Sequence, residues 1–501
     1  MMKKLSVISL ILLFATLILK FSSMLRDILI SRFYGLSGDS DAYFAAMNIP
    51  NICILFLLTG IKETFLPKYF QFKDLNGKLS YTSMMIRGTF YIALIGSIIG
   101  IFISLIVVPL LFSNFNQHGK QIAVWTAIYY FLSLGFVGMN SIYEGYLEAN
   151  RKFAWSIFSQ LIVVLFVITG LIFFHEEFGI LSIPLFYLIG TIVSFFLKKA
   201  GFTYFYRYRE KLNLDWNKIS EFYVSFLPIG LTAAVGQINL SVDASFASHL
   251  DEGIVSSFNY AFRLVNIPQA IFGVTVATMI YPIIAKAFHD KNIALFKKSM
   301  EKGLVYMFLL LAPAIVGMCY LMPELVKVIY TNFSASDAAL TSSFAIFFLG
   351  SVLAYSIQAV IAKGLYTLDK GSIILKAGLF SVLLNVGFNF ILVKFFGAYG
   401  LALSSSLVGL IYCFITFSSF YKLVNRINLK WVVVHYIKIS LAAIVMFTCL
   451  IYLKKVYFLI FTNLYFYLGY ITIGGILIYT LFVGIFNFNI LYPKVKSRMK
   501  K

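Results

Sequence analysis

Fourteen long apolar stretches divide this chain of 501 residues, and each is long enough to cross a membrane as a helix. They cover residues 6–33, 42–62, 84–112, 121–147, 154–174, 179–198, 221–247, 254–285, 303–329, 338–362, 372–394, 398–421, 432–453 and 462–487. The longest interruption, residues 199–220, is too short for a soluble catalytic domain. We therefore predict an all-α polytopic membrane protein of about 14 transmembrane helices, whose function lies among those helices.

The composition and the distribution of charge agree with this class. The chain is 60% hydrophobic and 12% charged, whereas a soluble domain has roughly 25% charged residues. Its 41 Lys and Arg against 20 Asp and Glu would suggest nucleic-acid binding in a soluble protein. When both termini are placed in the cytoplasm, 29 of the 41 basic residues lie in inside segments and four in outside loops. We therefore expect cytoplasmic termini and no nucleic-acid partner.

A short internal repeat suggests two related halves. The motif Asn-Ile-Pro at residues 48–50 recurs at residues 266–268, six apolar stretches later. We therefore predict two pseudo-symmetric six-helix lobes plus two C-terminal helices, with Pro50 and Pro268 as hinge points. The predicted domains are an N-lobe (1–200), a cytoplasmic linker (201–220), a C-lobe (221–425), and helices 13–14 with a basic C-terminal tail (426–501).

Two cations lie deep inside the first apolar stretch. Lys20 is fourteen residues into it, about 21 Å at 1.5 Å per residue, which places it near the middle of the membrane. Arg26 points about 120° away from Lys20 on an ideal helix, so we expect a bend at residues 22–23 if both cations face one cavity. A charge at this depth costs roughly 2.5–3.5 kcal/mol, which makes both residues candidates for a functional site.

Arg263 lies at a depth comparable to that of Arg26, in the eighth apolar stretch. One interpretation is a cationic cavity between the lobes for an anionic substrate, because arginine binds phosphate oxygens in a bidentate manner. The other is a set of structural ion pairs, in which Arg26 pairs with Asp27 or Asp41.

A second polar group combines oxygen atoms that suit a small cation. It consists of Asp243, Asn385, Asn389, the backbone carbonyl of Leu401, and Ser405. The alternative is ordinary hydrogen bonding between packed membrane helices. The chain has neither a nucleotide-binding GxxxxGK[ST] motif nor a GxSxG motif, so we expect no cofactor and no use of bound ATP.

Two long motifs resemble those of the MurJ/MviN family of lipid II flippases, in the multidrug/oligosaccharidyl-lipid/polysaccharide exporter superfamily. The first comprises Arg26-Asp27, Gly35, Asp41-Ala42-Tyr43-Phe44, Ile49-Pro50-Asn51, Gly60 and Pro67. The second comprises Gln237-Ile238-Asn239, Asp243, Phe246-Ala247-Ser248, Tyr260-Ala261, Arg263-Leu264, Pro268, Phe272-Gly273-Val274 and Pro282. The resemblance covers about residues 5–425.

This resemblance implies a flippase and not an enzyme. Such a protein moves the undecaprenyl-pyrophosphate-linked peptidoglycan precursor, lipid II, across the bacterial plasma membrane by alternating access. It implies coupling to Na⁺ or to the membrane potential, and contacts with membrane lipids and with cell-wall synthesis proteins. The substrate-binding residues would be Lys20, Arg26, Asp41 and Arg263, and the sodium ligands would be Asp243, Asn385, Asn389, Leu401 and Ser405.

The chain also departs from the family pattern. Ile54 and Leu55 stand where the family usually carries an arginine pair, and Phe262 stands where an acid is usual. Asn389 replaces an expected carboxylate of the sodium site. The alternative substrate is therefore a lipid-linked repeat unit of a capsular polysaccharide or exopolysaccharide.

Overall fold

The computed structural model describes residues 2–150, 152–205, 214–460 and 463–491. These residues form sixteen α-helices, one short 3₁₀ turn and one π-helical turn, and contain no strand. The predicted all-α class is confirmed. Parts of the predicted linker, residues 206–213, and of the predicted C-terminal tail, residues 492–501, lie outside the described residues.

The chain separates into two compact units, residues 1–256 and 257–501. The first unit contains α1 (Met2–Tyr34), α2 (Gly38–Gln71), α3 (Leu75–Leu111), α4 (Gln117–Ala149), α5 (Phe153–Phe173), α6 (His175–Phe178), η1 (Gly179–Leu181), α7 (Ser182–Phe205) and α8 (Trp216–Ala247). The second begins within α9 (Ile254–Pro268) and continues through η2 (Gln269–Gly273), α10 (Val274–His289), α11 (Ile293–Ile329), α12 (Ala335–Thr367), α13 (Gly371–Phe396), α14 (Tyr399–Leu423), α15 (Leu429–Ile460) and α16 (Leu464–Leu491). The predicted lobe boundary at residues 201–220 stays a prediction.

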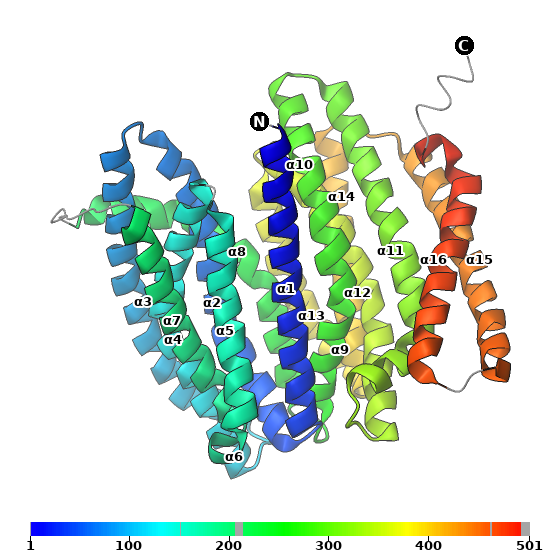
Figure 1. The fold of residues 1–501 in the computed structure, drawn as a ribbon, viewed down its shortest axis with the longest axis horizontal. Coiled ribbons are helices and arrows are strands. Elements are labelled where there is room, and N and C mark those ends of the chain that lie inside the picture. The colour runs from blue at the N-terminus through cyan, green and yellow to red at the C-terminus, as the bar shows by residue number, and fades with distance from the viewer. Residues whose placement is uncertain (1, 151, 206–213, 461–462, 492–501) are drawn as a thin grey trace. The chain divides into compact units, whose positions relative to one another are not determined.

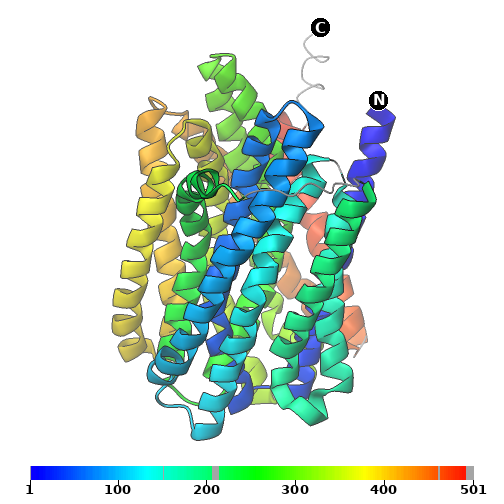
Figure 2. The same ribbon diagram turned by 90° about the vertical axis from the view of Figure 1, so that its left-hand side faces the viewer.

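In the first unit, long helices pack side by side along their length (Figures 1 and 2). Helix α2 packs against α4 and α8, α3 against α4, α5 against α7, and α1 against α5. Gly60 allows the close approach of α8 to α2, since a Cβ atom at Gly60 would lie 2.9 Å from the Cα of Gly230. The absence of a side chain at Gly60 therefore allows α2 and α8 to pack closely where they cross.

The second unit has two apolar cores. One joins α10 to α11, α12, α13 and α14, with Phe296, Met307 and Leu365 fully buried. The other joins α15 and α16 to α11, around Ile439, Tyr467 and Ile471. The two C-terminal helices therefore add their own core to α11 and do not extend the first one.

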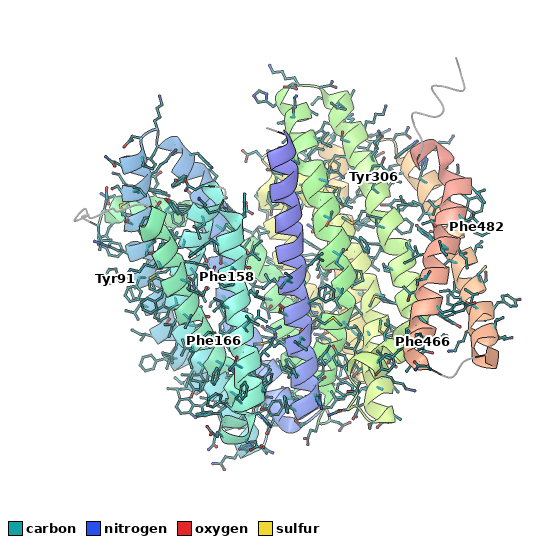
Figure 3. All side chains as sticks on the ribbon, in the orientation of Figure 1. Tyr91, Phe158, Phe166, Tyr306, Phe466 and Phe482 are labelled. Atoms are coloured by element: carbon teal, nitrogen blue, oxygen red, sulfur yellow. The ribbon has the colours of Figure 1, made fainter. Side chains whose placement is uncertain are left out.

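Thirteen helices of the described part are long and apolar enough to cross a membrane. Their outward surfaces are apolar, and Figure 3 shows Tyr91, Phe158 and Phe466 projecting from the helices, where 46%, 55% and 72% of their surface is exposed. Large exposed aromatic surfaces are typical of helices that face lipid. Helix α1, with 33 residues, is a further long helix beside these thirteen. The protein is a multi-pass membrane protein.

The two prolines of the internal repeat have different local structures. Helix α2 continues without interruption through Pro50. Helix α9 ends at Pro268, and a π-helical turn follows before α10 begins. Proline removes a backbone donor, and π-helical turns occur frequently at functional sites. The helix is therefore irregular directly after Pro268 and regular at Pro50, and the hinge role of both prolines stays a prediction.

Candidate functional site

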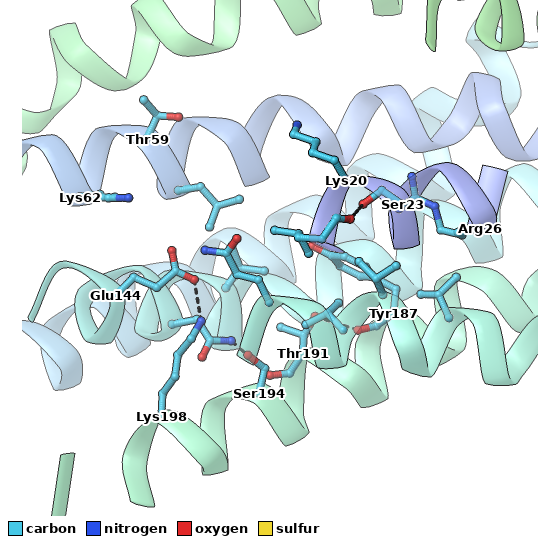
Figure 4. A pocket seen from close by; sticks show the side chains of 18 of the residues that line it. Lys20, Ser23, Arg26, Thr59, Lys62, Glu144, Tyr187, Thr191, Ser194 and Lys198 are labelled. Atoms are coloured by element: carbon cyan, nitrogen blue, oxygen red, sulfur yellow. Dashed lines mark hydrogen bonds and ion pairs between the residues drawn. The ribbon is translucent and has the colours of Figure 1, made fainter. Parts of the chain in front are cut away.

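A cavity of about 470 Å³ lies within the first unit and is lined by α1, α2, α4, α5 and α7 (Figure 4). Its volume is in the range of small-molecule binding sites. Helix α5 supplies an apolar wall of valines, Val163, Val164 and Val167. The charged residues that line the cavity are Lys20, Arg26, Lys62, Glu63, Glu144 and Lys198.

The structure brings Lys20 and Arg26 to the same cavity, which lies within the first unit. Both line it together with Ser23, which lies halfway between them along α1. At 100° per residue these three side chains span an arc of about 120° around the helix, centred on Ser23. The long side chains of Lys20 and Arg26, at the two ends of this arc, can therefore both reach the cavity. The expected bend is not needed, and α1 is one helix from Met2 to Tyr34. The Ser23 hydroxyl donates to the carbonyl of Leu19, at 2.9 Å.

Arg26 also makes the ion pair that the second interpretation predicted. Its Nη2 and Nε donate to Oδ1 of Asp27 at 2.8 and 3.0 Å. This arrangement uses two of the five guanidinium N–H groups on one oxygen atom. Lys20 forms no ion pair with any residue in the described part of the chain. The α1 wall therefore presents one locally paired and one unpaired cation.

The wall opposite α1 contains a buried ion pair that the sequence analysis missed. Nζ of Lys198, on α7, lies 2.6 Å from Oε1 of Glu144, on α4, and only 2% and 6% of the two residues is exposed. In the sequence, Lys198 is the last residue of the apolar stretch 179–198 and is followed by Lys199, so it has the pattern of a cytoplasmic span end. Helix α7 instead continues to Phe205, which keeps Lys198 inside the bundle.

A second pair lies at the α2 side of the cavity. Lys62 Nζ lies 2.6 Å from Oε1 of Glu148, and the two side chains are 33% and 20% exposed. Lys62 is near the end of a predicted span, where a lysine usually extends toward the headgroups, yet here it lines the cavity. Glu63 lies beside it. The lining thus contains four cations and two acids. Lys198 pairs with an acid of the lining, Glu144. Arg26 and Lys62 pair with acids outside the lining, and Lys20 forms no ion pair among the described residues.

Asp41 does not line this cavity. It is 3% exposed, and its two carboxylate oxygens accept the backbone N–H groups of Gly253 and Ser256 at 2.6 and 2.7 Å. Ser256 lies in the first turn of α9, whose N–H groups have no helical acceptor, and Gly253 directly precedes this helix. Asp41 therefore caps this helix from α2, and its predicted role in substrate binding stays a prediction.

Replacing Asp41 by Ala is expected to lower the free energy of unfolding by about 2–4 kcal/mol, because two buried N–H groups lose their acceptors. Asp39→Ala is the matched control, since Asp39 lies in the same helical turn but its side chain is 43% exposed and lies 3.6 Å from His118. The control is expected to cost less than about 1 kcal/mol. Unfolding of the solubilised protein, followed by tryptophan fluorescence, measures both. Equal losses for the two variants would contradict the capping role.

The remaining predicted site residues are distributed over both units. Arg263 lies half-buried on α9, in the second unit. Asn385 and Asn389 are fully buried on α13. Helix α13 packs against α14, which contains Leu401 and Ser405. Asp243 is buried on α8, in the first unit. Within the described ranges no three His, Cys, Asp or Glu side chains are grouped to hold a metal ion, and the sodium site stays a prediction.

The sequence of this chain is similar to those of known proteins. A family model described as "Lipid II flippase MurJ" matches residues 30–471. The "Probable lipid II flippase MurJ" of Buchnera aphidicola subsp. Acyrthosiphon pisum (strain APS) is 26% identical over 404 residues, which are 78% of this chain and 79% of that protein. The "Lipid II flippase MurJ" of Thermosipho africanus (strain TCF52B) is 26% identical over 490 residues, 97% of this chain and 98% of the relative.

Solved structures show the same similarity. A structure titled "Lipid II flippase MurJ, inward closed conformation" matches with a TM-score of 0.81 and 25% identity, over 96% of this chain and 100% of that chain. An inward-facing multidrug resistance transporter of the MATE family, in the MOP superfamily, matches with a TM-score of 0.64 and 14% identity, over 81% of this chain and 94% of that chain. The second similarity concerns the fold alone.

Proposed function

Because this chain belongs to the lipid II flippase MurJ family, we propose that it moves lipid II from the cytoplasmic to the outer leaflet of the bacterial plasma membrane. The observation that carries this proposal is the family match over residues 30–471, together with similarity over nearly the whole length of a MurJ structure. The protein is a transporter, and the apolar outer surface of its helices suits a substrate whose polyprenyl tail stays in the lipid.

The headgroup diphosphate binds the cations of the α1 wall. Arg26 keeps guanidinium N–H groups beyond the two that Asp27 accepts, and these groups match the oxygens of a phosphate. Lys20 adds a positive charge on the same wall, without an acidic partner among the described residues. Arg263 of the second unit is the third cation in this proposal, and Asp41, which caps α9, is its acidic member.

The headgroup crosses the membrane by alternating access. The two units change their relative position, Pro50 and Pro268 act as hinge points, and the headgroup is exposed first to the cytoplasm and then outside. The π-helical turn after Pro268 supports a hinge there, because its i→i+5 hydrogen bonds interrupt the regular α-helical pattern. Both chain termini lie in the cytoplasm, and cell-wall synthesis proteins receive the substrate outside.

The membrane potential drives the return of the empty carrier. Each positive charge that crosses the full potential gains roughly 2.3 kcal/mol per 100 mV, and the empty site carries unneutralised cations. A sodium ion is the second source of energy, held by oxygen atoms of Asp243, Asn385, Asn389, Leu401 and Ser405. Asn389 brings no charge to such a site, so its electrostatic hold on sodium is weaker than that of a carboxylate.

Expression in bacteria depleted of their own lipid II flippase tests the proposed function. We expect the chain to restore growth and peptidoglycan synthesis, because the precursor again reaches the outer leaflet. The control is the same chain with a stop codon early in α1. No restoration, with the full-length chain present in the membrane, would contradict lipid II as the substrate. Restored capsule export in a strain that lacks its capsule flippase would then favour the alternative glycan.

A further inference from the structure

The wall of the cavity opposite α1 carries two buried polar atoms that have no hydrogen-bond partner in the described part of the chain. They are Oδ1 of Asn140, on α4, and Oγ of Ser194, on α7. Both residues line the cavity, and only 4% and 1% of their surface is exposed. Buried polar groups in folded proteins are nearly always hydrogen-bonded, so two unpartnered atoms on one cavity wall need an explanation.

The local structure leaves these two atoms available to a ligand. Nδ2 of Asn140 donates to the backbone carbonyl of Thr191 at 3.2 Å, which joins α4 to α7 and fixes the orientation of the amide. The hydroxyl of Thr191 donates to the carbonyl of Tyr187, one turn earlier on α7, as hydroxyls in helices usually do. Ser194 makes no such bond. Its hydroxyl can therefore both donate and accept a hydrogen bond, and it lines the same cavity as the acceptor oxygen of Asn140.

This wall has no net charge. Glu144 lies one helical turn after Asn140, and Lys198 lies one turn after Ser194. Their 2.6 Å ion pair neutralises both groups, so the wall attracts neither an anion nor a cation over a distance. In this respect it differs from the α1 wall across the cavity, where Lys20 and Arg26 are concentrated (Figure 4).

We propose that Asn140 and Ser194 form a subsite for an uncharged amide or hydroxyl group of the substrate headgroup. An amide fits this pair best, because its N–H donates to Oδ1 of Asn140 and its carbonyl accepts from the hydroxyl of Ser194. The cations of α1 hold the diphosphate, and the α4–α7 wall distinguishes a headgroup with sugar and peptide amides from a bare diphosphate. This inference rests on the proposed function and adds a selectivity element to the same cavity.

Binding of two probes to the purified, solubilised protein tests the subsite. One probe is lipid II, and the other is undecaprenyl pyrophosphate, which has the same tail and diphosphate but no sugar or peptide. Asn140→Leu and Ser194→Ala are each expected to weaken lipid II binding about fivefold to tenfold, the effect of one lost hydrogen bond. Binding of undecaprenyl pyrophosphate is expected to stay unchanged. Lys20→Gln is expected to weaken the binding of both probes.

Ser159→Ala is the matched control for Ser194→Ala. Ser159 is fully buried on α5, but it is not among the cavity-lining residues, and its hydroxyl donates to the carbonyl of Ser156. The control is expected to bind both probes as the wild type does. Equal losses for both probes in Asn140→Leu and Ser194→Ala, or no loss for either, would overturn the subsite. A wild-type protein that binds neither probe would contradict the proposed function, and the subsite with it.

Discussion

Arg26→Ala is expected to lower the rate of lipid II translocation about 100-fold. Each hydrogen bond from a charged donor contributes about 1.5–3 kcal/mol, and a bidentate contact with the diphosphate contains two of them. Since 1.4 kcal/mol corresponds to a factor of ten, even the lower figure gives two orders of magnitude. The measurement is the rate at which lipid II appears on the outer face of bacteria that depend on this chain.

Two further variants separate this account from a purely structural role of Arg26. Arg26→Lys keeps the charge but loses the planar, bidentate geometry, so we expect an intermediate rate. In the structure Arg26 also neutralises Asp27, at 2.8 Å. The double variant Arg26→Ala with Asp27→Ala also removes the acid whose charge Arg26 balances, and we expect it to remain as slow as Arg26→Ala. Recovery of the rate in the double variant would show that Arg26 acts only by pairing Asp27.

Breaking the buried pair of Glu144 and Lys198 is expected to lower the free energy of unfolding by about 3–5 kcal/mol. Either single variant, Glu144→Leu or Lys198→Met, leaves one charge buried without its partner. An uncompensated buried charge strongly destabilises the folded protein. The double variant removes both charges and keeps similar volumes, so we expect a stability within about 1 kcal/mol of the wild type.

Unfolding of the solubilised single and double variants measures this coupling as a double-mutant cycle. The pair of Lys62 and Glu148 is a matched control, because it has the same 2.6 Å separation but 33% and 20% side-chain exposure. We expect its single variants to cost clearly less, since water reaches both charges. Single variants of the buried pair as stable as the wild type would show that the two charges are not coupled.

The membrane spans were predictable from the sequence, because a span requires an apolar run of about 20 residues: thirteen predicted stretches correspond to the thirteen candidate spans, and the first corresponds to α1. Their ends were not. The sequence predicted a span over 42–62, whereas α2 covers Gly38–Gln71, and the stretch predicted to begin at residue 303 begins as a helix at Ile293. A helix can continue beyond the apolar core of the membrane with polar residues, because its backbone hydrogen bonds are internal. Hydropathy detects the membrane-embedded part only.

The α1 wall of the cavity was also predictable, because Lys20 and Arg26 are charges in an otherwise apolar stretch. The opposite wall was not. Lys198 is next to Lys199 at the end of an apolar run, so it looks like part of a cytoplasmic loop. Its partner, Glu144, is 54 residues away on another helix, and a single sequence contains no signal for a pairing between distant helices. The spacing of Thr191, Ser194 and Lys198 along one face of α7 was the available hint.

The most direct test of the central claim is the amount of lipid II on the outer leaflet of cells depleted of their own flippase. An externally added enzyme that cleaves lipid II reports this amount, because it reaches only the outer leaflet. We predict that the wild-type chain restores cleavage and that Arg26→Ala, present in the membrane at the same level, does not. Lipid II that stays protected in cells expressing the wild-type chain would contradict the proposed function. Full cleavage with Arg26→Ala would contradict the role of the α1 cations.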